Sequence, residues 1–217
     1  MKHLVFWFDP ISPFAHLAFH RLPGLLQGHS VEVSYRPGLL AALLAHWGQK
    51  GPAEIEPKRA WTFRHVHWLA ARQGVDLVTP QQHPFNPLAL LRLVVAAGPN
   101  RQVVDAVLKH VWNPAAGESR DANDPQRLAR LQTELLQGGL PPRDPNGADV
   151  KAELRRHTDA AIALGIFGVP TVEFEGRLFW GLDGLDMLAA YLRGDAWFDG
   201  TGWKAEGAAR PAIRRTV

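Results

Sequence analysis

The chain begins with an apolar run, a segment of helical spacing and a segment of alternating spacing. Residues 3–9, HLVFWFD, are apolar on both faces and rich in β-forming side chains, which predicts a central strand covered on both sides. A helix is predicted to begin at Pro13. Its apolar side chains form one stripe: Phe14, Leu17, Ala18 and Leu22. Residues 31–37, VEVSYRP, alternate and predict a second strand, so the three segments predict a right-handed β-α-β unit.

The apolar spacing then becomes helical for more than a hundred residues. Breaks rich in Pro, Gly and Asn separate the predicted helices. These helices cover residues 39–47, 58–74, 87–98, 101–112, 125–139 and 149–165. No fixed period relates them, so we do not expect a solenoid.

Strand patterning returns in residues 171–181, TVEFEGRLFWG, where two short runs flank Glu175-Gly176 and predict a hairpin. A last helix is predicted with Asp183 as its N-cap and Asp186 three residues later. The tail from Ala196 is predicted to be loose. Its aromatic side chains are expected to fold back on the core: Trp197, Phe198 and Trp203.

The order of elements, β-α-β, helices and then β-β-α, defines the expected fold class. Neither end of the chain completes a sheet alone, so the simplest closure joins both ends in one sheet. This arrangement is α/β, a thioredoxin-like fold with a large all-helical insertion domain. The predicted boundaries are a discontinuous thioredoxin-like domain of residues 1–38 and 165–195, an insertion of residues 39–164 and a tail of residues 196–217.

Composition limits the chemistry that the chain can supply. Its 217 residues include no cysteine, which excludes disulfides, thiolate metal sites and a thiol nucleophile of the protein's own. Lys and Arg are scattered apart from the basic end at 210–217, and the net charge is only +3, so nucleic acid is not an expected partner. No segment reaches the length of a signal core or the roughly 20 residues of a membrane span, so we expect a soluble, cytoplasmic protein.

Ser12-Pro13 is the first candidate for chemistry. Serine is a favoured N-cap and proline is favoured at the first helical position, so an ordinary helix start explains both residue types. A hydroxyl and free N–H groups at a helix N-terminus also make an anion site, where the pKa of a thiol would be lowered. Since the chain has no cysteine, that thiol would have to come from another molecule.

Two later motifs are further candidates. Pro170 precedes a strand, and a cis Val169–Pro170 bond would leave the Val169 backbone free to pair with a peptide-like ligand. Sequence alone does not predict the cis state, because most X-Pro bonds are trans. Asp183 is interpreted either as a helix cap alone or also as the partner of a ligand ammonium group.

Other patterns in the sequence have simpler explanations than a functional site. His16 and His20 have an i, i+4 spacing that could hold zinc, but no third ligand is evident and we expect no metal. Ser12 lacks the G-x-S-x-G sequence of a hydrolase nucleophile. Three aromatic residues are expected to pack in the core or between domains rather than to form a ligand cage: Trp61, Phe63 and Trp68.

The motifs together resemble a known family. The sequences FDPISPFAHLA, RPGLL, GPAEIEPKRAW, FNPLALLRL and GIFGVPTVEFEGRLFWGLDGLDML are similar to those of 2-hydroxychromene-2-carboxylate isomerases and kappa-class glutathione transferases, within the DsbA-like thioredoxin superfamily. The resemblance covers about residues 3–193. It implies glutathione as the missing thiol, a small-molecule acceptor as substrate and a homodimer.

The resemblance also implies roles for particular residues. Ser12 would stabilise the glutathione thiolate, and Val169 before Pro170 would pair with the cysteinyl backbone. Asp183 would hold the γ-glutamyl end. The turn around it would contribute to the same subsite: Gly181, Leu182 and Gly184.

The implied reaction is the cis/trans isomerisation of a 2-hydroxychromene-2-carboxylate-like α-keto acid from an aromatic pathway, by reversible addition of the thiolate. Lys58 and Asn86 would line the acceptor pocket between the domains. A kappa-like transferase that conjugates glutathione to electrophiles is the first alternative. A non-catalytic binding protein on a thioredoxin scaffold is the second.

The sequence departs from the family pattern at two places. It reads GLDG where relatives commonly read GQDR or GNDR, so Leu182 and Gly184 replace a polar residue and an arginine. The loss of a charge-assisted hydrogen bond there could weaken glutathione binding by about 1.5–3 kcal/mol. Ala45 and Gln49 stand where relatives often have a lysine and an asparagine, which leaves room for a different acceptor.

Overall fold

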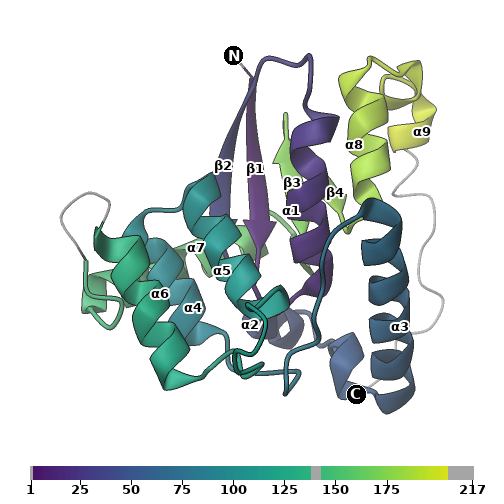
Figure 1. Cartoon of the computed structure of the whole chain (residues 1–217). Helices are drawn as coiled ribbons and strands as arrows, with labels where there is room; N and C mark the ends of the chain where they lie inside the picture. Colours follow the sequence, from purple (N-terminus) through teal and green to yellow (C-terminus); the bar gives the residue numbers. More distant parts are fainter. Residues whose placement is uncertain (1, 138–142, 205–217) are drawn as a thin grey trace.

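The computed structural model describes residues 2–137 and 143–204. Its four strands form one sheet in the order β2-β1-β3-β4 (Figure 1). Their bounds are β1 (Lys2–Phe8), β2 (Val31–Pro37), β3 (Thr171–Phe174) and β4 (Arg177–Trp180). β1 pairs in parallel with β2 and antiparallel with β3, with Trp7 opposite Thr171. The prediction that the two ends of the chain share one sheet is confirmed.

β1 is apolar on both faces because helices cover both. Its Leu4, Phe6 and Phe8 belong to the larger apolar cluster, on the side of α1 (Pro13–Leu25), which crosses in front of the sheet in Figure 1. Its Val5 and Trp7 pack on the opposite side, against side chains of α2 (Leu40–His46) and α7 (Ala148–Ala163). α8 (Gly184–Leu192) lies beside α1.

The six helices predicted between the second and third strands are all present. Besides α2 and α7 they are α3 (Glu56–Gln73), α4 (Leu88–Ala97), α5 (Arg101–Trp112) and α6 (Pro125–Gln137), with a short 3-10 turn η1 (Pro52–Glu54) before α3. α2 and α7 pack on the sheet itself. The predicted division of the chain into domains at residues 39 and 164 stays a prediction. No helix in the described ranges is both long and apolar enough to span a bilayer.

The tail is predicted to be loose, but residues 196–204 are ordered, and two of their aromatic rings return to the sheet as expected. After η2 (Ala196–Phe198) the chain forms α9 (Thr201–Lys204). The rings of Phe198 and Trp203 lie 6.2 and 5.9 Å from the ring of Phe179 in β4. Trp197 remains 48% exposed, so this part of the prediction is wrong. The basic segment 210–217 lies outside the described residues.

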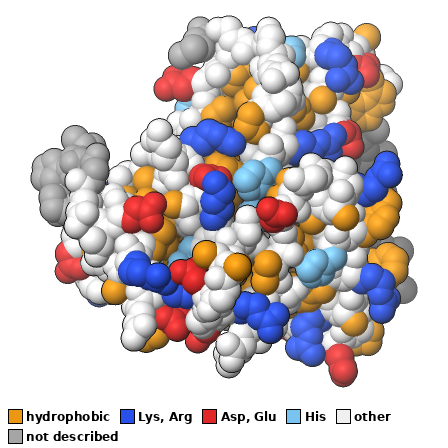
Figure 2. Space-filling model, viewed as in Figure 1, with side chains coloured by type: hydrophobic (Ala, Val, Ile, Leu, Met, Phe, Trp, Pro, Cys, Tyr) orange, Lys and Arg blue, Asp and Glu red, His pale blue; other side chains and the backbone are white. Residues whose placement is uncertain are grey.

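The prediction that Trp61 and Trp68 are packed is also wrong. Their residue surfaces are 61% and 60% exposed, because α3 turns Val66 and Ala70 toward the core instead. Phe63 is partly buried against the core, as expected. On the face shown in Figure 2, Lys and Arg side chains are interspersed with Asp and Glu.

Candidate functional site

Ser12 ends the turn after β1 and caps α1. Its backbone is extended, with φ −88° and ψ 116°, and its Oγ accepts the N–H of Ala15 at 3.2 Å. The hydroxyl donates to the carbonyl oxygen of Val169, also at 3.2 Å, across 157 residues of sequence. The predicted helix start is confirmed, and the hydroxyl lies directly against the loop before β3.

The loop before β3 presents backbone groups next to Ser12. The Val169–Pro170 peptide bond is cis. Within residues 2–137 and 143–204, neither the N–H nor the carbonyl of Val169 forms a backbone hydrogen bond. The Pro170 carbonyl accepts the N–H of Gly181 at 2.8 Å, which joins this loop to the turn before α8. Four of the predicted site residues therefore adjoin one another.

The turn before α8 differs from its prediction. Asp183 precedes α8 but its backbone is already helical, with φ −70° and ψ −32°, and its side chain caps no N–H. The capping box is not formed, because Asp186 pairs with Arg21 of α1. Arg21 also donates to the carbonyl of Leu182 at 3.4 Å. The Asp183 carboxylate is exposed and remains free of the cap that we expected it to form.

Gly184 has a physical reason to be glycine. A Cβ built at this position would lie 3.0 Å from the carbonyl carbon of Phe179. Any side chain here, an arginine included, would require the Phe179 backbone to give by a few tenths of an ångström. The neighbouring Leu182 is buried, and its side chain belongs to the core rather than to a polar subsite.

Lys58 and Asn86 lie on the surface. Lys58 is in the first turn of α3, and Asn86 precedes α4, where its Oδ1 accepts the N–H of Leu88 at 3.1 Å. The ring of His65, two turns after Lys58, lies 6.2 Å from the ring of Phe14, so α3 approaches the first turn of α1. Among the described residues no hydrogen bond joins either Lys58 or Asn86 to Ser12, and their role in acceptor binding stays a prediction.

Sequence reasoning missed three side chains that contact the turn of residues 9–12: the buried Asp9 and Trp112 and the half-buried His83. Asp9 is fully buried, and this burial raises the pKa of its carboxyl to about 7, against the effect of the two N–H groups that it accepts. Its position at the end of an apolar strand was a signal, since buried carboxylates are rare.

His16 and His20 lie together on α1, with ring centroids 4.6 Å apart. Nε2 of His16 donates to the carbonyl of Asp76 at 3.2 Å, and burial lowers the pKa of His16 to about 4. In the described part of the chain, no three His, Asp or Glu side chains gather as metal ligands would. We therefore interpret His16 and His20 as two side chains that pack against each other.

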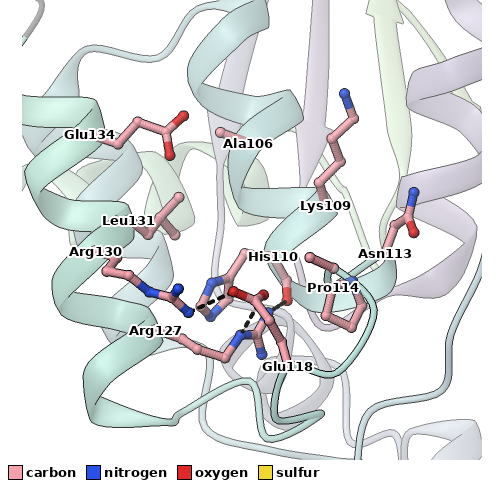
Figure 3. Close-up of a pocket in the computed structure, with 11 residues that line it drawn as sticks. Ala106, Lys109, His110, Asn113, Pro114, Glu118, Arg127, Arg130, Leu131 and Glu134 are labelled. Atoms are coloured by element: carbon pink, nitrogen blue, oxygen red, sulfur yellow. Dashed lines mark hydrogen bonds and ion pairs between the residues drawn. The ribbon is translucent and has the colours of Figure 1, made fainter.

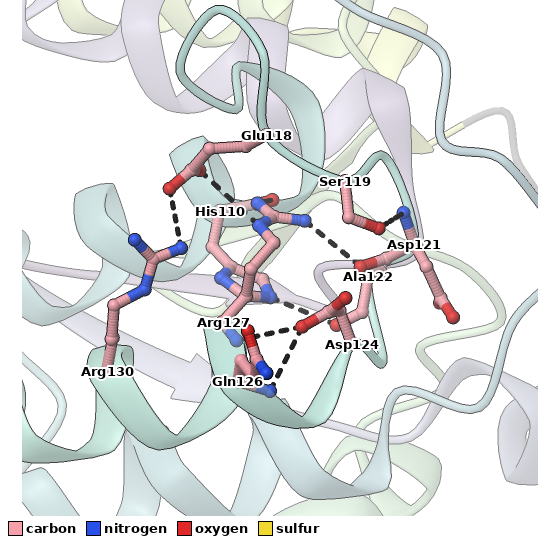
Figure 4. A network of polar contacts seen from close by, with 9 residues as sticks. All are labelled: His110, Glu118, Ser119, Asp121, Ala122, Asp124, Gln126, Arg127 and Arg130. Carbon is pink, nitrogen blue, oxygen red and sulfur yellow. Dashed lines mark hydrogen bonds and ion pairs between the residues drawn. The ribbon is translucent and has the colours of Figure 1, made fainter.

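A separate hollow of about 340 Å³ lies between α5 and α6 (Figure 3). Its buried Arg127 donates to the carbonyls of His110 and Asp121 and lies 3.4 Å from a carboxylate oxygen of Glu118. Glu118 also pairs with Arg130 at 2.6 Å (Figure 4). These charges satisfy one another, and none of the predicted site residues lines the hollow, so we interpret the network as structural.

This interpretation predicts a difference between two neighbouring arginines. Arg127→Met should lower the free energy of unfolding by about 2 kcal/mol, because two half-buried carbonyls lose a charged donor. Arg130→Met, at an exposed side chain, should cost less than about 1 kcal/mol. Urea unfolding measures both. Equal losses would contradict the structural role of Arg127.

Comparisons with known proteins agree with this fold. The model of the DSBA-like thioredoxin domain matches residues 3–193. The chain is 28% identical to a 2-hydroxychromene-2-carboxylate isomerase of Sphingobium xenophagum over 197 residues, which are 88% of this chain and 98% of the relative. It is 25% identical to glutathione S-transferase kappa 1 of Rattus norvegicus over 215 residues, 89% and 92% of the two chains.

A solved structure shares the fold over nearly the whole chain. The structure of a 2-hydroxychromene-2-carboxylate isomerase superposes with a TM-score of 0.72 and 22% identity, covering 91% of this chain and 97% of the other. At this identity the likeness establishes the fold alone.

Proposed function

Because the chain belongs to the family of DSBA-like thioredoxin domains, we propose that it is a glutathione-dependent enzyme that holds the sulfur of glutathione as a thiolate beside Ser12. One observation carries the proposal. In a chain without cysteine, a hydroxyl at a helix N-terminus lies 3.2 Å from a carbonyl that has no backbone partner among the described residues. The similarity to relatives named as isomerases and glutathione transferases supports it.

The hydrogen bonds around Ser12 can be exchanged without loss. The hydroxyl has one proton, which it donates to Val169. In the proposed complex this proton turns toward the sulfur, and the Val169 carbonyl accepts an N–H of the cysteinyl backbone instead. Pro13 has no N–H, and in the described residues the Phe14 N–H has no backbone acceptor, so it is a second donor for the thiolate.

The γ-glutamyl end would bind at the turn before α8. Its ammonium group would pair with the exposed carboxylate of Asp183, and its carboxylate would face the backbone between Gly181 and Gly184. Leu182 and Gly184 supply no polar side chain there. We therefore expect glutathione to bind more weakly than it would with the arginine of the family pattern.

The proposed reaction is the isomerisation of a conjugated α-keto acid resembling a 2-hydroxychromene-2-carboxylate. The thiolate adds to the C=C bond, rotation follows about the resulting single bond, and the same C–S bond then breaks to return the thiolate. No atom or electron is gained or lost. Lys58 and Asn86 would contact the acceptor. The homodimer and the cytoplasmic location implied by the resemblance stay predictions.

The second candidate is a kappa-like transferase, favoured by the 25% identical relative of that name. Both activities use the same thiolate, but a transferase consumes glutathione and an isomerase does not. Counting free thiols during turnover, with an unsaturated α-keto acid and with a chlorinated aromatic acceptor, distinguishes the two.

Glutathione binding is the direct test of the proposed function. We expect glutathione at millimolar concentration to raise the melting temperature and to give a binding isotherm by calorimetry, since a ligand of the folded state stabilises it by mass action. S-methylglutathione is the control, because it has the same backbone and no thiolate, and it should bind more weakly. The absence of any binding would favour a non-catalytic scaffold.

A further inference from the structure

The turn that delivers Ser12 is held by side chains as well as by its own backbone. Oδ1 of Asp9 accepts the N–H of Ile11 at 3.0 Å, and Oδ2 accepts the N–H of Leu40 at 2.9 Å. The N–H of Ser12 donates to the Asp9 carbonyl, also at 3.0 Å. One fully buried residue therefore ties the turn to the start of α2.

Two further side chains reach the same turn from other elements. Nε1 of Trp112, at the end of α5, donates to the carbonyl of Pro10 at 2.8 Å, and this side chain is fully buried. Nε2 of His83, in the connection between α3 and α4, lies 2.8 Å from the Ile11 carbonyl. A carbonyl only accepts, so Nε2 carries the proton. The two rings lie 5.8 Å apart.

These contacts satisfy most of the backbone groups of the turn. The carbonyls of Asp9, Pro10 and Ile11 and the N–H groups of Ile11 and Ser12 all have partners. Two of these partners, His83 and Trp112, come from separate places between β2 and β3 in the sequence, and the others lie in the turn itself. The hydroxyl of Ser12 thus has a fixed position before any ligand arrives, which is the condition for stabilising a charge without reorganisation.

We propose that Asp9, His83 and Trp112 form a clamp that positions the Ser12 hydroxyl and the Phe14 N–H for the sulfur of the ligand. The inference rests on the proposed function, because it gives these three residues a positioning role at the proposed glutathione site. A buried carboxyl without an opposite charge is costly to a fold, and burial raises the pKa of Asp9 accordingly. Such a group beside a candidate site is typical of a functional position.

The chain offers a matched pair of variants. Asp9→Asn keeps the shape of the side chain but replaces one acceptor oxygen with an NH₂ donor. This NH₂ group then lies against the N–H of either Ile11 or Leu40, and that hydrogen bond is lost. Thr158→Val removes the acceptor of the adjacent Leu39 N–H, at 3.1 Å, from another buried side chain, whose hydrogen bonds lie outside the turn. Both lose a hydrogen bond at the start of α2, but only Asp9→Asn disturbs the clamp.

The ultraviolet absorbance of the thiolate, followed against pH in the glutathione complex, measures the pKa of the bound thiol, which depends on how well the Ser12 hydroxyl and the Phe14 N–H are positioned toward the sulfur. We expect Asp9→Asn to raise the pKa of the bound thiol by about one unit and to lower kcat about ten-fold, with a smaller change in the KM for glutathione. Thr158→Val should leave the pH profile unchanged. Equal profiles for the wild type and Asp9→Asn would overturn the clamp, and a wild type without any thiolate band would overturn both the clamp and the proposed function.

Variants of His83 test the clamp from another part of the chain, and they can be used if Asp9→Asn does not fold. His83→Gln can still donate to the Ile11 carbonyl, whereas His83→Leu cannot. We expect the glutamine variant to retain most of the low thiol pKa and the leucine variant to lose it. Identical thiol pKa values in the two folded variants would contradict a positioning role.

Discussion

Ser12→Ala should lower kcat about 10- to 100-fold and raise the pKa of the bound thiol, while the protein stays folded. A hydrogen bond to a charged group contributes about 1.5–3 kcal/mol, which is a factor of this size in rate. The N–H of Phe14 and the helix N-terminus remain, so activity should fall rather than vanish. Initial rates at saturating glutathione and the thiolate absorbance of the complex measure the two effects.

A loss of the helix cap must be separated from a loss of chemistry. Ser12→Ala removes the acceptor of the Ala15 N–H, which costs about 1 kcal/mol of stability. Asn100→Ala removes the equivalent cap of α5, where Oδ1 accepts the N–H of Val103 at 3.0 Å. We expect the two variants to unfold at similar urea concentrations, but only the first to lose activity. Full activity in Ser12→Ala would remove the proposed mechanism.

The fold could be predicted because its elements carry local signals. The apolar run of β1, the Ser12-Pro13 helix start and the hairpin at Glu175-Gly176 depend on neighbouring residues, and the structure contains all three. Closure of one sheet from both ends of the chain followed from element order. The cis Val169–Pro170 bond has no local signal strong enough to predict it.

The errors arose where tertiary contacts decide the outcome. Trp61, His65 and Trp68 form one i, i+4, i+7 stripe on α3, and their rings stack on one another. Periodicity alone does not show that such an aromatic stripe faces away from the core. At Asp183 the residue type favoured a side-chain cap. The backbone of Asp183 is helical, however, whereas a capping residue typically has an extended backbone.

The proposed clamp could not be predicted from the sequence, for a different reason. Asp9, His83 and Trp112 are far apart along the chain, and each contacts backbone atoms, which leave no mark on residue type. A buried carboxyl at the end of β1 was the only visible signal. Ser12 was identifiable because capping and the proposed chemistry both require a hydroxyl, whereas the groups that hold its turn could only be found in three dimensions.

Two buried groups should act in opposite directions on stability as the pH changes. The pKa of Asp9 is raised from 3.8 in the unfolded chain to about 7, so folding favours its protonated form. This contribution is fully present below pH 3.8 and is lost as the pH rises through about 7. The pKa of His16 is lowered from 6.5 to about 4, so its contribution is present above pH 6.5 and is lost as the pH falls toward 4.

Each effect becomes visible when one group is removed. Asp9→Asn is neutral at every pH, so its free energy of unfolding should rise relative to the wild type between pH 4 and pH 7, by up to about 4 kcal/mol. His16→Gln keeps a donor for the Asp76 carbonyl and should become relatively more stable as the pH falls from 6.5 to 4, by up to about 3 kcal/mol. Urea unfolding at several pH values measures both differences.

The decisive result is the direction in which each difference in the free energy of unfolding, variant minus wild type, changes with pH. An Asp9 carboxyl that ionises normally would give Asp9→Asn a constant offset from the wild type above about pH 5, because both its folded and its unfolded forms would be charged. A difference that keeps growing to pH 7 requires a carboxyl that burial holds protonated. Because the same residue accepts the N–H groups of Ile11 and Leu40, such a result would also show that a side chain in contact with the turn beneath Ser12 changes its charge near neutral pH.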